Sequence, residues 1–306
     1  MSYIVSKLIG YLRLLRPANI ITAIADVLAG VAISGYFIPV SLNALTLDMT
    51  LPVVCLCLAT IGLYGGGVVF NDVFDAELDK VERPERPIPD GVISKTQAVI
   101  LGSYMLLVGI LAAFAVGRFN GASGWIALAI TASALIYDKW GKHSAALGPV
   151  NMGLCRGLNL LLGVSIVPAA LATYWWVGFV PVVYIAAITN ISRGEVFGGD
   201  TRSLKISASC YIAVFITMLT FAVMHNRLLT ALPFILLFAW MVMNPLMKAM
   251  KDPIGPNIGK AVKAGIVALV VMNAAWVSAF ATLNFALAVL LLLPVSIFLG
   301  KIFAVT

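Results

Sequence analysis

Ten stretches of mostly apolar residues, most of them about 20 residues long, constrain the fold of this chain more than any other feature. They lie near 18–38, 51–70, 97–117, 121–137, 148–170, 174–192, 207–224, 229–248, 261–281 and 283–300. A run of this length crosses a bilayer as a helix, whereas a membrane β-barrel is built from alternating strips of about ten residues. Apolar residues make up 61% of the 306 residues and charged residues only 11%, which excludes a soluble globular enzyme and a disordered chain. We therefore predict an all-α, polytopic transmembrane bundle of nine or ten helices.

The basic residues predict the orientation of the bundle. If the ten spans alternate, one side of the membrane holds 17 Lys and Arg residues, and the other side holds two, Arg118 and Arg227. The 17 are Lys7, Arg13, Arg16, Lys80, Arg83, Arg86, Lys95, Lys139, Lys142, Arg193, Arg202, Lys205, Lys248, Lys251, Lys260, Lys263 and Lys301. Basic residues collect in cytoplasmic loops, so we expect both termini and the long loops to be cytoplasmic. The net charge of +7 is explained by topology and does not indicate a nucleic-acid partner.

The loop pattern indicates one membrane domain over 1–306, with a possible internal duplication. Long basic loops recur after every second helix, which divides the chain into four-helix halves at 17–140 and 148–250 and an extra C-terminal hairpin at 261–300. An Arg-x-x-Asn pattern opens each half, at Arg16–Asn19 and at Arg156–Asn159. Because four is an even number, such halves would be parallel repeats.

Chemistry is expected where seven of the 13 acidic residues fall together. The stretch 71–91 reads NDVFDAELDKVERPERPIPDG and directly continues the second apolar run. If the helix continues, Asn71, Asp75 and Asp79 share one face, with Asp72 one step round. Crowded carboxylates repel one another unless a cation joins them, and oxygen ligands without His or Cys favour Mg²⁺. Arg83 and Arg86 follow, each before a proline, and are placed to bind a diphosphate.

Two charged residues lie inside apolar runs, where a charge is costly and usually functional. Asp26 lies in the first span and Arg156 in the fifth. Arg156 is predicted either to reach a diphosphate or to pair with Asp26. Tyr64 and Tyr137, at the predicted cytoplasmic ends of spans, either stabilise a cation with their ring faces or belong to an interfacial aromatic belt.

The stretch from Asn71 to Asp79, followed by Arg83-Pro and Arg86-Pro-Ile-Pro, resembles the first signature of the UbiA superfamily of intramembrane prenyltransferases. The resemblance extends to Arg16-Pro-x-Asn19 and to a loop from Tyr137 to Lys142 that is similar to the family's tyrosine–lysine loop. The sequence from Gly148 to Asn159 is most similar to the EboC-like branch of UbiA-like proteins.

This resemblance implies a helical bundle whose central cavity is capped by cytoplasmic loops. It also implies Mg²⁺-dependent transfer of an isoprenyl group from its diphosphate to an aromatic or lipid acceptor, in contact with membrane lipid. The residues then expected at the site are Asp72, Asp75, Asp79, Asp200 and Lys142 for catalysis; Asn71, Asp75, Asp79 and Asp200 for the metal; and Asn19, Arg83, Arg86, Tyr137, Arg156, Asn159 and Arg202 for the substrates.

One segment departs from the family pattern. The family carries a second Asp-x-x-x-Asp after the sixth span, and here Val196 stands where its first aspartate is expected, with Asp200 at the second. Glu195 is one residue out of register and would point about 100° away on a helix. Two alternatives to a prenyltransferase therefore remain: a UbiA-like protein that binds an isoprenoid diphosphate without turnover, and a lipid or isoprenoid transporter that uses Asp26 and Arg156.

Overall fold

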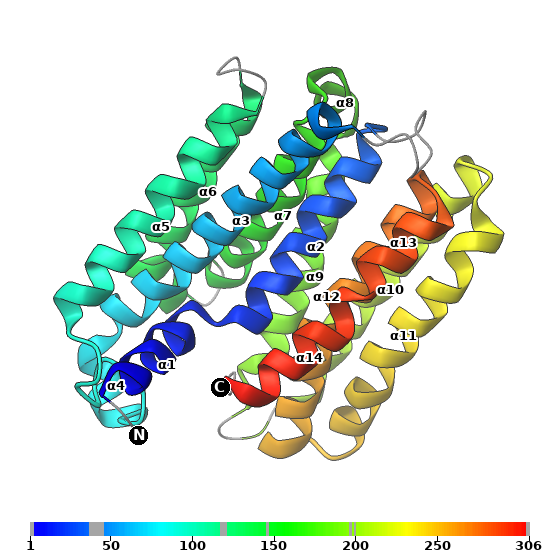
Figure 1. The fold of residues 1–306 in the computed structure, drawn as a ribbon. Helices are drawn as coiled ribbons and strands as arrows, with labels where there is room; N and C mark the ends of the chain where they lie inside the picture. The colour runs from blue at the N-terminus through cyan, green and yellow to red at the C-terminus, as the bar shows by residue number, and fades with distance from the viewer. Residues whose placement is uncertain are drawn as a thin grey trace.

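The computed structural model describes residues 3–36, 46–116, 121–144, 147–195, 198 and 200–303, which form a bundle of long helices (Figure 1). The α-helices are α1 (Tyr3–Leu15), α2 (Pro17–Ile33), α3 (Leu47–Phe74), α4 (Ala76–Glu82), α5 (Lys95–Ala115), α6 (Ala122–Lys139), α7 (Leu147–Val164), α8 (Pro168–Tyr174), α9 (Phe179–Ser192), α10 (Thr201–Met224), α11 (Leu228–Lys251), α12 (Gly255–Phe280), α13 (Leu283–Leu290) and α14 (Leu292–Ile302). Two short 3₁₀ turns, η2 (Gly141–His143) and η3 (Trp175–Gly178), interrupt the connections. The predicted all-α class is confirmed.

The described helices account for the ten predicted spans. Seven segments are long and apolar enough to cross a membrane, or eight if the bent pair α1–α2, which turns by 41°, counts as one span. The remaining predicted spans are α6 and α7, which pack against each other and against α3. α13 and α14 together form the tenth. Figure 1 shows α1, α4 and the end of α14 at the same end of the bundle, as an even number of passes requires.

Local signals explain where several helices begin. Pro17 stands in the first turn of α2, where its missing N–H is not needed. Ser94 caps α5 in a reciprocal arrangement with Gln97. Arg16, between α1 and α2, adopts a left-handed backbone conformation with φ of 48°, which costs free energy for a residue other than glycine.

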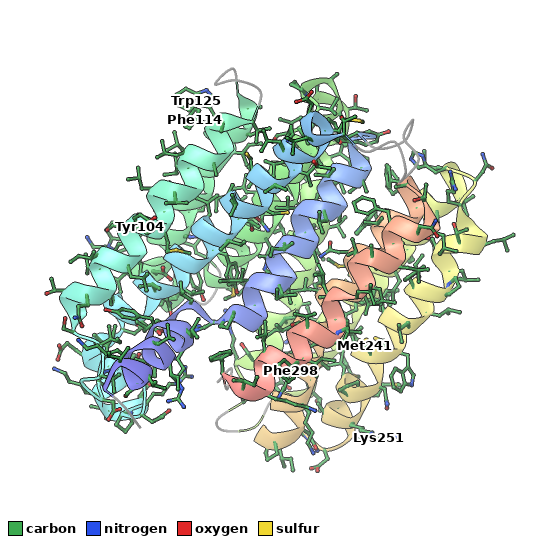
Figure 2. All side chains as sticks on the ribbon, in the orientation of Figure 1. Tyr104, Phe114, Trp125, Met241, Lys251 and Phe298 are labelled. Carbon is green, nitrogen blue, oxygen red and sulfur yellow. The ribbon has the colours of Figure 1, made fainter. Side chains whose placement is uncertain are left out.

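The outer surface of the bundle is apolar, as a lipid-facing surface must be. Tyr104 on α5, Trp125 on α6 and Phe298 on α14 are each more than 60% exposed and project outward (Figure 2). The charged and polar side chains of the described residues, in contrast, lie mainly in the interior or at the helix ends. The arrangement supports an integral, multi-pass membrane protein.

The halves of the chain meet at a close crossing of α2 and α7. A Cβ added to Gly30 would lie 2.1 Å from the carbonyl oxygen of Leu160, and one added to Gly163 would lie 2.1 Å from that of Val27. Only glycine allows these backbones to approach so closely. The division into repeated halves stays a prediction.

The C-terminal hairpin is not peripheral along its whole length. Every residue of α12 from Ala268 to Phe280 is buried, because this helix packs against α2, α9 and α11. The second arm, α13 and α14, lies at the edge of the bundle, where only 17% of its apolar stretch is buried. The sequence indicated an addition to the bundle, whereas the first arm of this hairpin is part of its core.

Candidate active site

The first acidic motif lies where α3 ends and α4 begins. Asp75 is the junction residue, and its backbone N–H still donates to the carbonyl of Asn71 while its own carbonyl accepts from Asp79. The predicted continuous helix is therefore broken by one residue only. Asp72 and Asp79 are each 4% exposed, and Asp75 is half-buried. Three carboxylates are thus held at one end of the bundle within little more than two helical turns.

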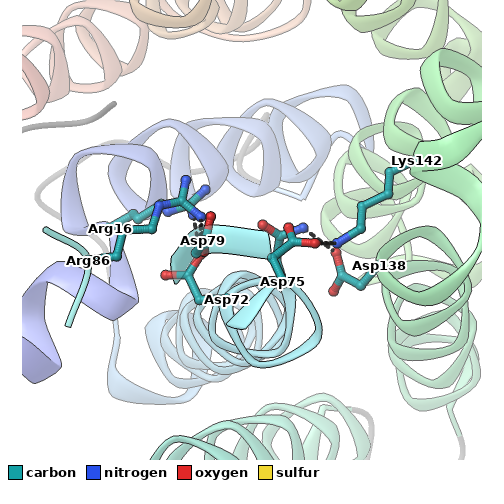
Figure 3. A network of polar contacts seen from close by, with 8 residues as sticks. Arg16, Asp72, Asp75, Asp79, Arg86, Asp138 and Lys142 are labelled. Atoms are coloured by element: carbon teal, nitrogen blue, oxygen red, sulfur yellow. Dashed lines mark hydrogen bonds and ion pairs between the residues drawn. The ribbon is translucent and has the colours of Figure 1, made fainter. Parts of the chain in front are cut away.

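Two arginines neutralise one side of this motif. Arg16 Nη2 lies 2.5 Å from Asp72 Oδ1, and Arg86 Nη1 lies 3.2 Å from the same oxygen and 2.7 Å from Asp79 Oδ2 (Figure 3). Arg16 comes from the junction between α1 and α2, where its backbone is left-handed. Charge-assisted pairs of this kind are among the stronger polar contacts in proteins.

A lysine and a further aspartate lie on the other side. Lys142, in η2, forms an ion pair with Asp75, so the loop after α6 reaches the first motif. Asn71 Nδ2 donates to Asp138 Oδ1 at 3.0 Å. Asp138, at the end of α6, is 4% exposed and was missed in the sequence. The only available signal was a carboxylate directly after Tyr137 at the end of an apolar run.

Three more residues expected from the resemblance lie on α2, on α6 and at the end of α4. Tyr137 is partly buried in the last turn of α6, and Asn19 is partly buried in the first turn of α2. Arg83 is exposed at the end of α4 and lies outside the ion pairs just described. On the exposed face of α4, Lys80 donates to Glu77 at 2.7 Å, and this hydrogen bond lowers the pKa of Glu77.

The second motif lies at the start of α10. Val196 lies outside the described residues. Asp200 is exposed and acts as the N-cap of α10, where its Oδ1 accepts from the backbone N–H of Arg202 at 3.0 Å. Arg202 and Glu195 are also exposed, and Glu195 lies against Gly259 of α12. The roles expected of Asp200 and Arg202 stay predictions.

Arg156 and Asn159 belong to a separate network deep in the bundle. Arg156 Nη1 lies 2.6 Å from Asp26 Oδ2, and its Nη2 donates to Thr22 at 2.7 Å. Asn159 donates to Asp26 at 3.3 Å and accepts from Thr60 at 2.7 Å. Of the two alternatives predicted for Arg156, the described structure therefore has the pair with Asp26.

Two further side chains complete this network. Asn273 on α12 donates to Asp26 Oδ1 at 2.7 Å. The guanidinium of Arg156 lies 4.9 Å from the centre of the Tyr64 ring, so one cation already occupies this ring. The network joins α2, α3, α7 and α12.

The donor set of the first motif fits a hard cation. The side-chain atoms that it offers to a metal are oxygens, the ligands that Mg²⁺ prefers. Asp72, Asp75 and Asp79 already form ion pairs with three basic side chains. Close by, Asp138 Oδ2 is buried without a partner among the described residues. In the described ranges, however, no three carboxylate, His or Cys side chains are grouped closely enough to hold an ion. A metal held by three of these carboxylates would require them to lie closer together than they do here.

The fold and the site together define a polytopic membrane protein whose acidic and basic side chains cluster at one end of a helical bundle. The model of the UbiA prenyltransferase family matches residues 27–253, and the chain belongs to that family. Digeranylgeranylglyceryl phosphate synthase of Ignicoccus hospitalis is 29% identical over 200 residues, covering 63% of this chain and 59% of that protein. The same enzyme of Methanothrix thermoacetophila is 34% identical over 152 residues, covering 50% and 52%. The chain thus spans little more than half the length of these curated relatives.

Solved structures show the same fold. A UbiA homologue from Aeropyrum pernix superimposes with a TM-score of 0.67 at 15% identity, covering 84% of this chain and 96% of that one. A UbiA homologue from Archaeoglobus fulgidus, bound to DMAPP and Mg²⁺, gives a TM-score of 0.65 at 17% identity, covering 92% and 99%. The family and the fold predicted from the sequence are confirmed.

Proposed function

We propose that this chain transfers an isoprenyl group from a Mg²⁺-bound prenyl diphosphate to a hydrophobic acceptor. The observation that carries the proposal is the meeting of Asp72, Asp75 and Asp79 with Arg16, Arg86 and Lys142 at one end of an apolar bundle. Acids alone would suit a cation, and bases alone would suit an anion. Both together suit a metal–diphosphate, whose tail can lie in the apolar bundle.

The charged residues are placed to exchange partners when substrate binds. Asn71, Asp75 and Asp79 would hold the metal, as would Asp200 if its loop reaches the cluster. Arg16, Arg86 and Lys142 then become available to the phosphate oxygens. The bound cation supplies charge stabilisation to the leaving diphosphate. The basic side chains add to that stabilisation where negative charge develops, and the bundle excludes water from the reacting carbon.

The names of the curated relatives favour a lipid over an aromatic acceptor. Those relatives are digeranylgeranylglyceryl phosphate synthases, whose name denotes a phosphate-bearing lipid. We propose that the acceptor belongs to this class and approaches from the membrane. Membership of the EboC-like branch stays a prediction.

The basic residues support a cytoplasmic site. All three cations of the cluster are among the 17 on the predicted cytoplasmic side, against two on the other. The site would therefore receive a water-soluble diphosphate head group from the cytoplasm and its tail within the membrane.

The proposal is tested with purified full-length protein, Mg²⁺ and a labelled long-chain prenyl diphosphate. We expect diphosphate release by the wild type and none by Asp75→Ala, whose thermal unfolding stays close to that of the wild type. Glu85→Gln is the matched control, because it removes an exposed acid from the same loop. Unchanged Mg²⁺-dependent binding of the prenyl diphosphate by Asp75→Ala would refute the site.

A second candidate function is binding of an isoprenoid diphosphate without turnover. The exposed position of Asp200, whose carboxylate caps α10, favours it. Mg²⁺-dependent binding by the wild type without diphosphate release, with any acceptor lipid supplied, would support this alternative.

A further inference from the structure

Asp138 is a buried carboxylate that lies outside the family signature and has one oxygen without a partner among the described residues. It lies in the last turn of α6 and is 4% exposed. Its Oδ1 accepts a hydrogen bond from Asn71 Nδ2 at 3.0 Å, while its Oδ2 is buried and has no partner among the described residues. Leaving a buried oxygen unpaired costs free energy, so the position of this side chain calls for an explanation.

The surroundings of Asp138 are those of the first acidic motif. Asn71, which donates to Asp138 Oδ1, directly precedes Asp72 in α3. Figure 3 shows Asp138 on the same side of the cluster as Lys142 and Asp75, opposite Arg16 and Arg86. The unpaired oxygen of Asp138 therefore lies beside the proposed metal–diphosphate site and not on the lipid-facing surface.

We propose that Asp138 is a positioning residue of the metal–diphosphate site, an inference that rests on the proposed function. Because Asp138 Oδ1 accepts from Asn71 Nδ2, the amide of Asn71 turns its nitrogen toward α6. The amide oxygen of Asn71 is then the atom left for the metal. Carboxylates that orient a metal-binding side chain in this way are a common part of metal sites.

The unpaired Oδ2 has a second part in the same event. Lys142 is 14% and Asp75 17% exposed at the side chain, and they are paired in the described state. When Asp75 turns to the metal, the ammonium group of Lys142 loses this partner in a poorly solvated position, which is costly unless another acceptor is near. Asp138 Oδ2 is that acceptor, and it keeps Lys142 beside the phosphates.

The inference is tested by the Mg²⁺ dependence of ligand binding, using a prenyl thiolodiphosphate that is not turned over. We expect Asp138→Leu to raise the Mg²⁺ concentration for half-maximal binding by about 10- to 100-fold. Asp138→Asn, which retains an acceptor oxygen but no charge, should raise it by less. Glu85→Gln, an exposed acid of the same motif, should leave it unchanged. The ligand-free melting temperatures of Asp138→Asn and Glu85→Gln should match that of the wild type.

Coupling to Asn71 separates a positioning role from a structural one. If Asp138 acts through Asn71, adding Asp138→Asn to Asn71→Ala should shift the Mg²⁺ dependence less than it does in the wild type. Full additivity, or wild-type Mg²⁺ dependence of Asp138→Asn and Asp138→Leu, would overturn the inference. Wild-type protein that binds but releases no diphosphate would count against the proposed turnover alone, whereas no Mg²⁺-dependent binding by the wild type would overturn both.

Discussion

The buried pair of Asp26 and Arg156 gives the sharpest quantitative prediction. Asp26 is fully buried and receives Arg156 Nη1 at 2.6 Å and Asn273 Nδ2 at 2.7 Å. Asp26→Leu removes the negative charge and leaves the guanidinium of Arg156 buried, with Thr22 and the face of Tyr64 as its remaining partners in the described part of the chain. Breaking one side of a buried pair costs about 3–5 kcal/mol, because the other charge stays uncompensated.

Removing both charges should largely restore stability. In Asp26→Leu/Arg156→Met no buried charge remains, and replacing a buried pair by apolar side chains of similar size is often nearly neutral. Asn273 still loses its acceptor, and hydrogen bonds between helices in a membrane are worth about 0.6 kcal/mol on average. We therefore expect the double variant to lie within about 1–2 kcal/mol of the wild type.

The assay is thermal unfolding of the two single variants, the double variant and the wild type in one detergent, combined with Mg²⁺-dependent binding of a prenyl diphosphate. At about 2 °C per kcal/mol, Asp26→Leu should lower the Tm by roughly 6–10 °C, and the double variant should recover most of it. Recovery of both stability and binding would assign Arg156 to the internal pair, whereas recovery of stability without binding would assign it to the diphosphate as well.

Two results would refute this reasoning. The first is an Asp26→Leu variant that unfolds within about 2 °C of the wild type, equivalent to about 1 kcal/mol. The second is a double variant whose loss equals the sum of the two single losses. Either would mean that Asp26 and Arg156 do not compensate each other inside the bundle.

Three further predictions follow from other parts of the fold. In the second motif, Asp200→Ala should be as damaging to activity as Asp75→Ala, while Val196→Asp should leave activity equal or raise it. A misfolded Val196→Asp protein, together with an Asp200→Ala protein of wild-type activity, would show that this loop does not meet the first motif. At the helix crossing, Gly163→Ala should lower stability by about 1–3 kcal/mol or more, since its Cβ would lie 2.1 Å from a carbonyl oxygen, and thermal unfolding measures this. A reporter fused after Thr306 should be active in the cytoplasm, and a signal from the opposite side of the membrane would contradict the tenth span.

Much of the candidate site was accessible from the sequence because it is local. Asp72, Asp75 and Asp79 lie within eight residues on one helical stretch, so helix periodicity alone brings them together. The one-residue break at Asp75 did not separate them, because the backbone hydrogen bonds from Asp75 to Asn71 and from Asp79 to Asp75 continue through it. The apolar runs likewise predicted the helices, since a bilayer requires helices of about that length.

The partners of these carboxylates were decided by tertiary structure. Arg16 lies 56 residues from Asp72, and Asp138 lies 67 residues from Asn71; no periodicity relates such positions. Asp138 was missed because a carboxylate at the end of a span has the composition of an ordinary interfacial residue. Its burial and its unpaired oxygen exist only once α6 and η2 pack beside the end of α3.

Composition and spacing by themselves determined the membrane class, the helical spans and the acidic motif, because each depends on neighbouring residues and on the solvent that surrounds them. The sequence did not predict which helices pack against which, because an apolar run suits contact with lipid and contact with protein equally well. Tertiary structure placed α12 in the core and left α13 and α14 at the edge, and it chose Asp26 as the described partner of Arg156. A buried charge is stabilised by an opposite charge close to it. The packing of α2 against α7 determines that Asp26 is this residue for Arg156.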